Sequence, residues 1–323
     1  MADNCRRFVL QHTMDPVADG LYVGSAMAEG DEPLLREAGI THILSVASHY
    51  VASYPTRFTY KLVSIDDLPE ENIIQHFPEC NRFIGAALAG GGRVLVHCLA
   101  GQSRSAAVAA AFLMQRDRLD AEQALKVLKG RRPQIHPNAG FIEQLQLYRD
   151  LDYDVSTEKA LYRWFLIGRS ADYFRTHGAV GAVTVAARPA AQGRHAVRCR
   201  KCRCPLVDAP NIVDHRAGAG QAEFSFKKRD GSGTSTPHAF PQNHACSSLF
   251  VEPMEWMDSV GDGVVEGPIH CPKCRAKLGA YNWAGAQCSC GKWITPSFQI
   301  HRSKVDEVRH QLLSPPPPPP PLV

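Results

Sequence analysis

The chain has no long hydrophobic run. Its longest uninterrupted apolar stretch, residues 106–114, has nine residues, whereas a helix that crosses a bilayer needs about 20. The first ten residues also lack the apolar core of a signal peptide. We therefore expect a soluble intracellular protein that does not bind membranes.

Cysteine is scarce in the first part of the chain. Only Cys5, Cys80 and Cys98 precede residue 199, whereas the other eight of the eleven cysteines fall between residues 199 and 290. In a reducing compartment such a cluster indicates metal binding rather than disulfide bonds. This uneven distribution is the first indication of two different domains.

Charge is uneven in the same way. Residues 1–190 hold 20 lysines and arginines against 21 acidic residues, whereas residues 191–323 hold 16 against 11. The formal net charge of +4 therefore belongs to the second half. A length of 323 residues suits about two domains, and an apolar content of 44% excludes a wholly disordered chain.

The first 150 residues alternate between two kinds of pattern. Short β-favouring runs occupy residues 21–23, 42–46, 60–65 and 94–96. Helical patterns occupy residues 32–38 and 74–88 and follow the N-cap residues Asp120 and Asn138. This alternation predicts an α/β domain. A further helix is expected over residues 157–175.

Residues 94–105 carry the most informative pattern. A strand of buried type ends at His97 and Cys98, five residues follow, and Arg104 and Ser105 open an apolar helix. The free N–H groups at the start of a helix bind anions, and the same field holds a cysteine as its thiolate. We therefore predict that Cys98 attacks phosphorus and forms a covalent phosphocysteine.

The neighbouring residues suit this chemistry. Arg104 offers a planar fork for two phosphate oxygens and stabilises the transition state. Gly101 lets the loop turn tightly around the anion. Ser105 is placed to hydrogen-bond the sulfur and help it leave, and His97 is expected to orient the loop from behind.

Such an enzyme also needs a general acid that protonates the leaving oxygen. Asp66 and Asp67 lie 32 and 31 residues before Cys98, in a segment whose proline and acidic residues indicate a surface loop. The residues alone leave the two aspartates open as alternatives.

With these features the first 150 residues resemble the dual-specificity branch of the cysteine-dependent protein tyrosine phosphatases. The family loop, His-Cys-x-x-Gly-x-x-Arg-Ser/Thr, matches at every fixed position, and residues 20–25, 38–44 and 137–141 match as well. The resemblance implies a phosphatase-like central sheet flanked by helices. It also implies that Asp67, five residues before Asn72, is the general acid and then the base, with no cofactor in catalysis.

The same resemblance implies the substrate class. Members of this branch have shallow pockets that accept phosphotyrosine and phosphoserine or phosphothreonine, so phosphoproteins are the expected substrates. The substrate phosphate would be held by Leu99, Ala100, Gly101, Gln102, Ser103 and Arg104. The variable positions of this loop carry no lysine, which argues against polyphosphoinositides.

Closely spaced cysteines form the second set of candidates. The pairs are Cys199 with Cys202, Cys271 with Cys274, and Cys288 with Cys290. The first two pairs have the spacing of zinc knuckles, and Gly291 supplies a turn after the third pair. We predict that the second and third pairs bind one ion together. Further ligands for the first pair would come from Cys204, Cys246, His215, His238, His244 and His270. Zinc would stabilise a small domain that lacks core enough to fold alone.

The resemblance extends into this half of the chain. Residues 288–301 match the dual-specificity subfamily that carries a C-terminal zinc-binding domain of β-rich structure. This implies two structural zinc ions, with His215 and Cys246 completing the site of the first pair. Cys204 departs from the subfamily and leaves a four-cysteine first site open.

The subfamily acts in late maturation of the large ribosomal subunit. The resemblance therefore implies a role on the pre-60S particle, with its ribosomal RNA and proteins, and a location in the nucleus and cytoplasm. Basic stretches at residues 198–203 and 227–229 suit contact with a phosphate-rich particle. The alternative is that the chain is chiefly an assembly factor whose phosphatase activity is dispensable.

Four parts are expected along the chain. They are a catalytic domain at 1–155, a helix and linker at 156–195, a zinc-binding domain at 196–303 and a tail at 304–323. The tail contains a run of prolines that predicts an extended polyproline II conformation. Within the zinc-binding domain, Trp256, Trp283 and Trp293 are expected in the core.

Overall fold

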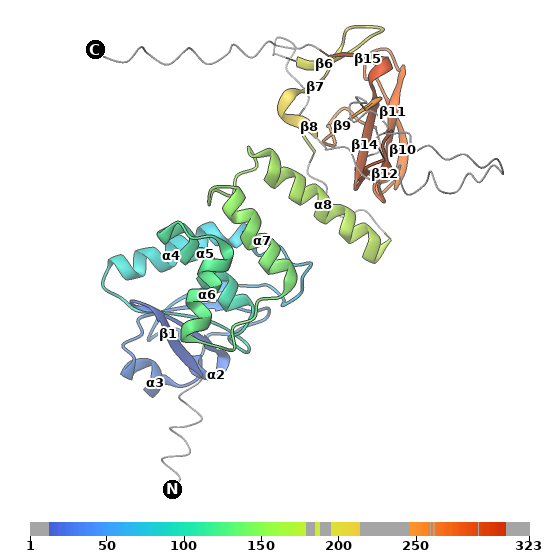
Figure 1. Cartoon of the computed structure of the whole chain (residues 1–323). Coiled ribbons are helices and arrows are strands. Elements are labelled where there is room, and N and C mark those ends of the chain that lie inside the picture. The colour runs from blue at the N-terminus through green and yellow to red at the C-terminus, as the bar shows by residue number, and fades with distance from the viewer. Residues whose placement is uncertain are drawn as a thin grey trace, which may run out of the picture. The chain divides into compact units, whose positions relative to one another are not determined.

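The computed structural model divides into two compact units, residues 1–162 and residues 163–323 (Figure 1). The residues that it describes are 13–178, 185–187, 195–213, 246–258, 260, 262–289 and 291–307. The predicted zinc ligands His215 and Cys290, the basic stretch at 227–229 and the proline run all lie outside the described residues.

A five-stranded sheet forms the centre of the first unit. Its strands are β1 (Met14–Ala18), β2 (Leu21–Ser25), β3 (His42–Val46), β4 (Thr59–Val63) and β5 (Val94–Cys98). Their order in space is β1-β2-β5-β3-β4, with β1 antiparallel to β2 and the other neighbours parallel. All residues of β5, the central strand, are buried. Cys98 therefore lies at the carboxyl end of a parallel sheet, where α/β proteins bind their ligands.

Helices pack on this sheet (Figure 1). They are α2 (Ala26–Glu29), α3 (Glu32–Glu37), the 3₁₀ turn η1 (Ile74–His76), α4 (Phe77–Ala89), α5 (Arg104–Asp117), α6 (Ala121–Arg131) and α7 (Ala139–Asp150). α5 contacts β5, α4, α6 and α7. The apolar run at residues 106–114 is the buried middle of α5, and in the described part of the chain no helix is long and apolar enough to cross a membrane.

The predicted helix starts are confirmed. Asp120 and Gln123 form a capping box at α6, with bonds of 2.8 and 2.9 Å between each backbone N–H and the other side chain. At α7 the Asn138 side chain accepts the Phe141 N–H at 2.9 Å. These bonds satisfy donors that the first turn of a helix leaves free. The Asn138 N–H also donates to the Ser103 hydroxyl at 3.1 Å, which places the start of α7 beside the catalytic loop, the loop between β5 and α5.

The second unit is rich in β-strands, as predicted. Its elements are α8 (Ala160–His177), β6 (His195–Cys199), β7 (Pro205–Asp208), η2 (Ala209–Asn211), β8 (Ile212–Val213), β9 (Ser248–Val251), β10 (Glu266–His270), β11 (Lys277–Asn282), β12 (Ala286–Gln287), β13 (Trp293–Ile294), β14 (Ser297–His301), η4 (Arg302–Lys304) and β15 (Val305–Glu307). One sheet has the order β10-β11-β14-β9-β8, a second has the order β15-β6-β7, and β12 pairs with β13.

Aromatic side chains dominate the core of this unit. Trp283 and Phe298 are fully buried and meet edge to face, with ring centroids 5.2 Å apart. Trp256 is buried as predicted. Ile167 and Ala171 of α8 join the same core, so this helix packs as part of the second unit.

Trp293 does not join the core, and its predicted burial is wrong. Its side chain is 59% exposed. It lies on the short ribbon of β12 and β13, where its Nε1–H donates to the Thr295 hydroxyl at 2.8 Å. A two-residue strand on a two-stranded ribbon cannot bury both of its faces, which is why composition alone misplaced this tryptophan.

Candidate active site and metal centre

The loop between β5 and α5 curls around the sulfur of Cys98. Gly101 stands in the left-handed region at a φ of 69°, and a Cβ at this position would lie 2.5 Å from the Gly24 carbonyl. Only glycine fits such a turn without strain. The Leu99 carbonyl accepts the Ala26 N–H at 3.1 Å, which ties the loop to α2.

Several donors converge on the nucleophile. The Cys98 Sγ lies 3.2 Å from the Ser105 hydroxyl and accepts the Gly101 N–H at 3.3 Å. Burial by itself raises the pKa of Cys98, but the Ser105 hydroxyl and the N–H groups of Ser105, Gly101 and Gln102 outweigh it. The net effect lowers the pKa of the thiol below its ordinary value. The loop therefore favours the thiolate.

Arg104 opens α5 and is buried, with 8% of its surface exposed. One terminal nitrogen donates to the Ile65 carbonyl at 3.1 Å, and Nε lies 3.7 Å from the Asp67 carboxylate. Nε has no hydrogen-bond partner among the described residues. A buried donor that lacks a partner is costly, so this guanidinium suits a bound anion.

The structure places Asp67, rather than Asp66, against the catalytic loop. One carboxylate oxygen of Asp67 accepts the Ser103 hydroxyl at 2.5 Å and the Asn138 side-chain amide at 2.9 Å. Asp66 accepts the Ser48 hydroxyl instead. Sequence reasoning identified Asn138 only as a helix cap, although its amide also orients the candidate acid.

His97 lies in β5, directly before the nucleophile. It is fully buried, its Nε2 lies 2.7 Å from the Ser45 hydroxyl, and its ring meets Tyr50 edge on at 4.9 Å. Burial lowers the pKa of His97 to about 4, against the opposing influence of the Glu29 carboxylate. His97 is therefore neutral near pH 7, and its side chain contacts Ser45 and Tyr50. That it orients the loop stays a prediction.

A buried carboxylate that sequence reasoning missed lies behind His97. Glu29 is fully buried and accepts hydrogen bonds from the hydroxyls of Tyr50, Ser53 and Tyr60 at 2.5 to 2.6 Å. Burial acts to raise the pKa of Glu29, but these donors lower it overall. In sequence Glu29 was one acid among many on a polar segment, and no local pattern distinguishes it.

Arg132 also escaped sequence reasoning. It is almost fully buried, donates from Nε to the Gly101 carbonyl at 2.9 Å and pairs with Asp15 at 2.6 Å. It therefore holds the catalytic loop from the side away from the sulfur. The basic run at the end of α6 is typical of a solvated helix terminus, so only the tertiary structure reveals this role.

The residues of the predicted phosphate-binding segment differ in how far they are buried. Gly101, Ser103 and Arg104 are buried, whereas the side chains of Leu99, Ala100 and Gln102 are exposed. The exposed side chains therefore face the substrate side of the loop or solvent. Contact with a phosphate from these three positions would come from the backbone.

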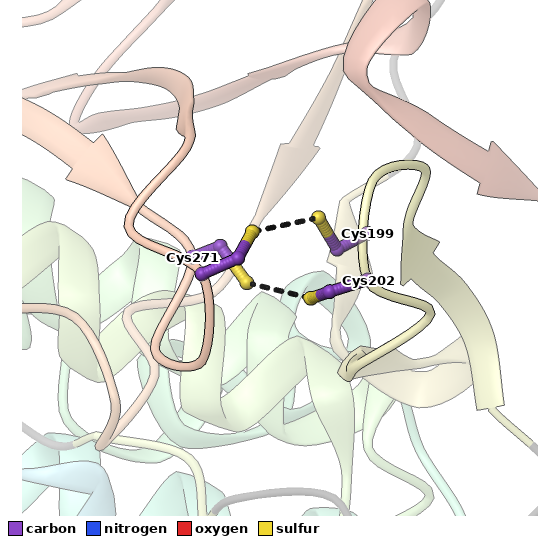
Figure 2. A group of neighbouring side chains, drawn as sticks. Cys199, Cys202 and Cys271 are labelled. Atoms are coloured by element: carbon purple, nitrogen blue, oxygen red, sulfur yellow. Dashed lines mark hydrogen bonds between the residues drawn. The ribbon is translucent and has the colours of Figure 1, made fainter.

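Four sulfurs gather in the second unit (Figure 2). Cys199 and Cys202 lie at the turn between β6 and β7, and Cys271 and Cys274 lie at the turn between β10 and β11. All four Sγ atoms lie within 4.8 Å of one another, with distances of 3.7 Å from Cys199 to Cys274 and 3.5 Å from Cys202 to Cys271. A tetrahedral zinc ion with bonds of about 2.3 Å separates its sulfurs by about 3.8 Å. The four side chains therefore fit one zinc ion.

This grouping corrects the pairing predicted from the sequence. The prediction joined Cys271 and Cys274 to Cys288 and Cys290, because only 13 residues separate the two pairs. The sulfurs of the former lie instead with the pair near residue 200. Proximity in sequence misled the prediction because two turns of separate sheets form the site.

The other predicted ligands are placed in part. Cys246 and Cys288 pack against Phe250, outside the four-sulfur group. The Ser247 N–H donates to the Ser289 hydroxyl at 2.9 Å, which joins the two segments. Among the described residues, the four-sulfur group does not include Cys204, the alternative ligand that the sequence left open.

Comparison with known proteins agrees with this geometry. The family model of the dual specificity phosphatase catalytic domain matches residues 21–151. Human dual specificity protein phosphatase 12 is 41% identical over 302 residues, which cover 91% of this chain and 88% of the relative. The tyrosine-protein phosphatase YVH1 of Saccharomyces cerevisiae is 31% identical, and the match covers 90% of each chain.

A solved phosphatase domain is similar to part of this chain. The Yvh1 phosphatase domain from Chaetomium thermophilum is 30% identical, with a TM-score of 0.41, and the match covers 45% of this chain and 99% of that domain. The identity to the human and yeast relatives extends over both units of the chain, the catalytic one and the cysteine-rich one. The chain therefore belongs to the dual specificity protein phosphatase 12 family of protein phosphatases.

Proposed function

We propose that the first unit dephosphorylates phosphotyrosine and phosphoserine or phosphothreonine in proteins through a phosphocysteine intermediate. The convergence of donors on one sulfur carries this proposal. The Ser105 hydroxyl and the Gly101 N–H lie 3.2 and 3.3 Å from the Cys98 Sγ. Such surroundings hold a cysteine as a nucleophilic thiolate.

In the first step, the Cys98 thiolate forms a bond to phosphorus while the bond from phosphorus to the substrate oxygen breaks. Asp67 gives its proton to the leaving oxygen. The Arg104 guanidinium and the loop N–H groups stabilise the charge on the remaining phosphate oxygens. The alcohol or phenol leaves, and the phosphoryl group stays on Cys98.

In the second step, water attacks phosphorus and the bond from phosphorus to sulfur breaks. Asp67, now ionised, accepts the proton of the water. The Ser105 hydroxyl donates to the departing sulfur, so that Cys98 leaves as a thiolate. Inorganic phosphate is released, and the side chains return to their starting protonation states.

The test compares three variants on aryl and alkyl phosphates. Cys98→Ser should be inactive, because a serine hydroxyl is not ionised in this loop. Asp67→Asn should lower kcat about 100-fold, with the larger loss on alkyl phosphates, whose leaving oxygen needs the proton more. Asp66→Asn is the matched control and should stay near wild type. Equal losses for the two aspartate variants would contradict the assignment of Asp67.

We further propose that the second unit contains two structural zinc ions and acts in late assembly of the large ribosomal subunit, in the nucleus and cytoplasm. One ion would be held by the four clustered sulfurs. The other would be held by Cys246, Cys288 and the predicted ligands His215 and Cys290. For this the Cys288 sulfur, which is disulfide-bonded in this structure, must be a free thiolate. Each ion would join loops that a unit of this size does not stabilise by packing alone.

A basic groove supports contact with a phosphate-rich particle. It has a volume of about 620 Å³ and lies beside the first cysteine pair. Its lining includes Arg200, Lys201, Lys277, His301 and Lys304. Within the described residues, no carboxylate pairs with the three lysines, whereas Arg200 faces Asp306 at 3.3 Å. Unpaired cations in a groove attract the phosphates of RNA.

The assembly role is tested in cells that lack their own relative of this chain. Cys98→Ser and the groove variant Lys201→Glu/Lys277→Glu are each introduced, and large-subunit maturation is followed by subunit profiles. We expect the groove variant to fail, while the control Lys292→Glu, exposed outside the groove, succeeds. Rescue by Cys98→Ser would favour the alternative of an assembly factor with dispensable catalysis. Rescue by the groove variant would contradict the proposed contact.

A further inference from the structure

We propose that an apolar rim around the catalytic loop selects substrates with apolar side chains next to the phosphorylated residue. The rim consists of Met27, Val51, Leu68 and Leu99. This inference rests on the catalytic assignment above and adds the class of sequence that the site prefers. It concerns the flanks of the phosphorylated residue, not the phosphate itself.

The four side chains are among the exposed large apolar side chains of the first unit, which also include Leu62 and Val127. Their exposed fractions are 65% for Met27, 82% for Val51, 52% for Leu68 and 71% for Leu99. Single apolar residues on a surface need no explanation. Several gathered on the loops of one site indicate a surface that binds another apolar group.

Two members of the rim follow catalytic residues directly in the chain. Leu99 follows the nucleophile Cys98, and Leu68 follows the candidate acid Asp67. The loop of residues 66–71, which we call the acid loop, meets the catalytic loop through the Ser103 hydroxyl, which donates to Asp67 at 2.5 Å. Leu68 and Leu99 therefore border the point where the substrate oxygen would leave.

Two contacts bring the other members to the same place. The Ala26 N–H donates to the Leu99 carbonyl at 3.1 Å, so that Met27, the next residue, starts its helix at the catalytic loop. The Ser48 hydroxyl donates to Asp66 of the acid loop, which anchors the segment that presents Val51. The four residues thus belong to four segments that hydrogen bonds join at the catalytic loop and the acid loop.

The charge of these loops favours the same substrates. The variable positions of the catalytic loop are Leu99, Ala100, Gln102 and Ser103, and none is charged. The acid loop adds Glu70 and Glu71 to its two aspartates. Acidic flanks on a substrate would be repelled there, and no cation of the catalytic loop besides Arg104 would attract them. Apolar side chains on either side of the phosphorylated residue would lie against the rim and lose contact with water.

The experiment measures a ratio of kcat/KM on the full chain. Two phosphotyrosine peptides are matched in length and net charge, one with leucine and the other with serine on both sides of the phosphotyrosine. We expect the leucine peptide to be favoured about tenfold, a discrimination usual for a small apolar contact. Met27→Ser/Val51→Ser should bring this ratio close to one. Val127→Ser, which removes an exposed apolar side chain from α6, is the matched control and should keep the ratio.

The outcomes separate this inference from the catalytic proposal. If wild type hydrolyses both peptides and an aryl phosphate, but with a ratio near one, the rim does not select substrates while the phosphatase assignment stands. If no substrate is hydrolysed, the catalytic proposal itself fails. A specific activity that falls as protein concentration rises, together with dimers in light scattering that Met27→Ser/Val51→Ser abolishes, would show that the rim binds a second copy instead.

Discussion

The charge state of Cys98 depends on a few contacts with its sulfur. Removal of the Ser105 hydroxyl tests this dependence. Ser105→Ala removes the side-chain donor that lies 3.2 Å from the Cys98 Sγ. A hydrogen bond to a charged group contributes about 1.5 to 3 kcal/mol, so the variant should raise the pKa of Cys98. We expect alkylation of Cys98 by iodoacetate at pH 6 to slow about tenfold. The rate is measured on the Cys98 peptide by mass spectrometry. An unchanged rate would show that the backbone donors suffice.

His97 makes the stability of the first unit depend on pH. Its pKa is lowered from 6.5 to about 4 because it is buried. As the pH falls below about 6.5, the unfolded chain binds a proton that the folded chain rejects until about pH 4. The free energy of unfolding should therefore fall across this window, by on the order of 3 kcal/mol for this one group, and level off below it.

Hydrogen exchange of the β5 amides at pH 7 and pH 4.5 measures this loss. In His97→Asn the difference between the two pH values should shrink, because asparagine does not titrate in this range. His49→Asn is the control, since His49 is exposed and asparagine tolerates its positive φ of 54°. If both variants retain the full difference, another buried group causes the pH dependence.

The residues of the catalytic loop could be predicted from the sequence because they lie close together in it, at the end of one strand, in one loop and at the start of one helix. Cys98, Gly101, Arg104 and Ser105 are fixed relative to one another by local backbone geometry. The supporting residue Arg132 lies 31 positions away from Gly101, to which it donates. No periodicity or capping rule predicts such a contact, so the supporting residues emerge only from the packed structure.

At the scale of elements, the close approach of α7 to the acid loop predicts a large effect from one methyl group. A Cβ on Gly140 would lie 2.1 Å from the Pro69 carbonyl oxygen. Gly140→Ala should push α7 away from the loop that bears Asp67. Overpacking of this kind costs about 1 to 3 kcal/mol, and kcat should fall because Asn138 loses its position on the acid.

The control for this change is another helical glycine. Apart from its chain neighbours and the backbone of its own helix, no atom of the described residues lies within 4 Å of a Cβ placed on Gly130 in α6. Gly130→Ala should therefore stabilise the first unit by about 0.5 to 1 kcal/mol and leave kcat unchanged. Urea unfolding and hydrolysis of an aryl phosphate are measured for both. Similar behaviour of the two alanine variants would contradict the role given to the contact with Pro69.

The positions of helices and strands could be predicted from the sequence more fully than the contacts between them. Strand β3 (His42–Val46) and the caps Asp120 and Asn138 match the predicted positions, because propensity and capping are local. The helix expected at 74 begins instead with a 3₁₀ turn, and α4 starts at Phe77 with a proline in its first turn. Proline lacks the N–H that an interior helical position would need, so it sets the helix start.

At the scale of the whole molecule, the corrected pairing of cysteines makes a prediction about zinc. Cys199→Ser and Cys271→Ser should each release the same ion, so the double variant should lose no more zinc than either single variant. Cys288→Ser should leave this ion bound. Elemental analysis of the purified full chains gives the zinc content. Loss of two ions in the double variant would restore the pairing first predicted from the sequence.

An ion bound at the four-sulfur centre would also reduce the conformational entropy of the unfolded chain. Its sulfur contacts join residues 75 and 69 positions apart, so a bound ion acts as a cross-link that closes a long loop. The entropy of closing a loop grows only with the logarithm of its length, by about 0.6 kcal/mol for each doubling. A change in the length of the stretch between the two turns would therefore alter the entropy that this cross-link removes from the unfolded chain only slightly.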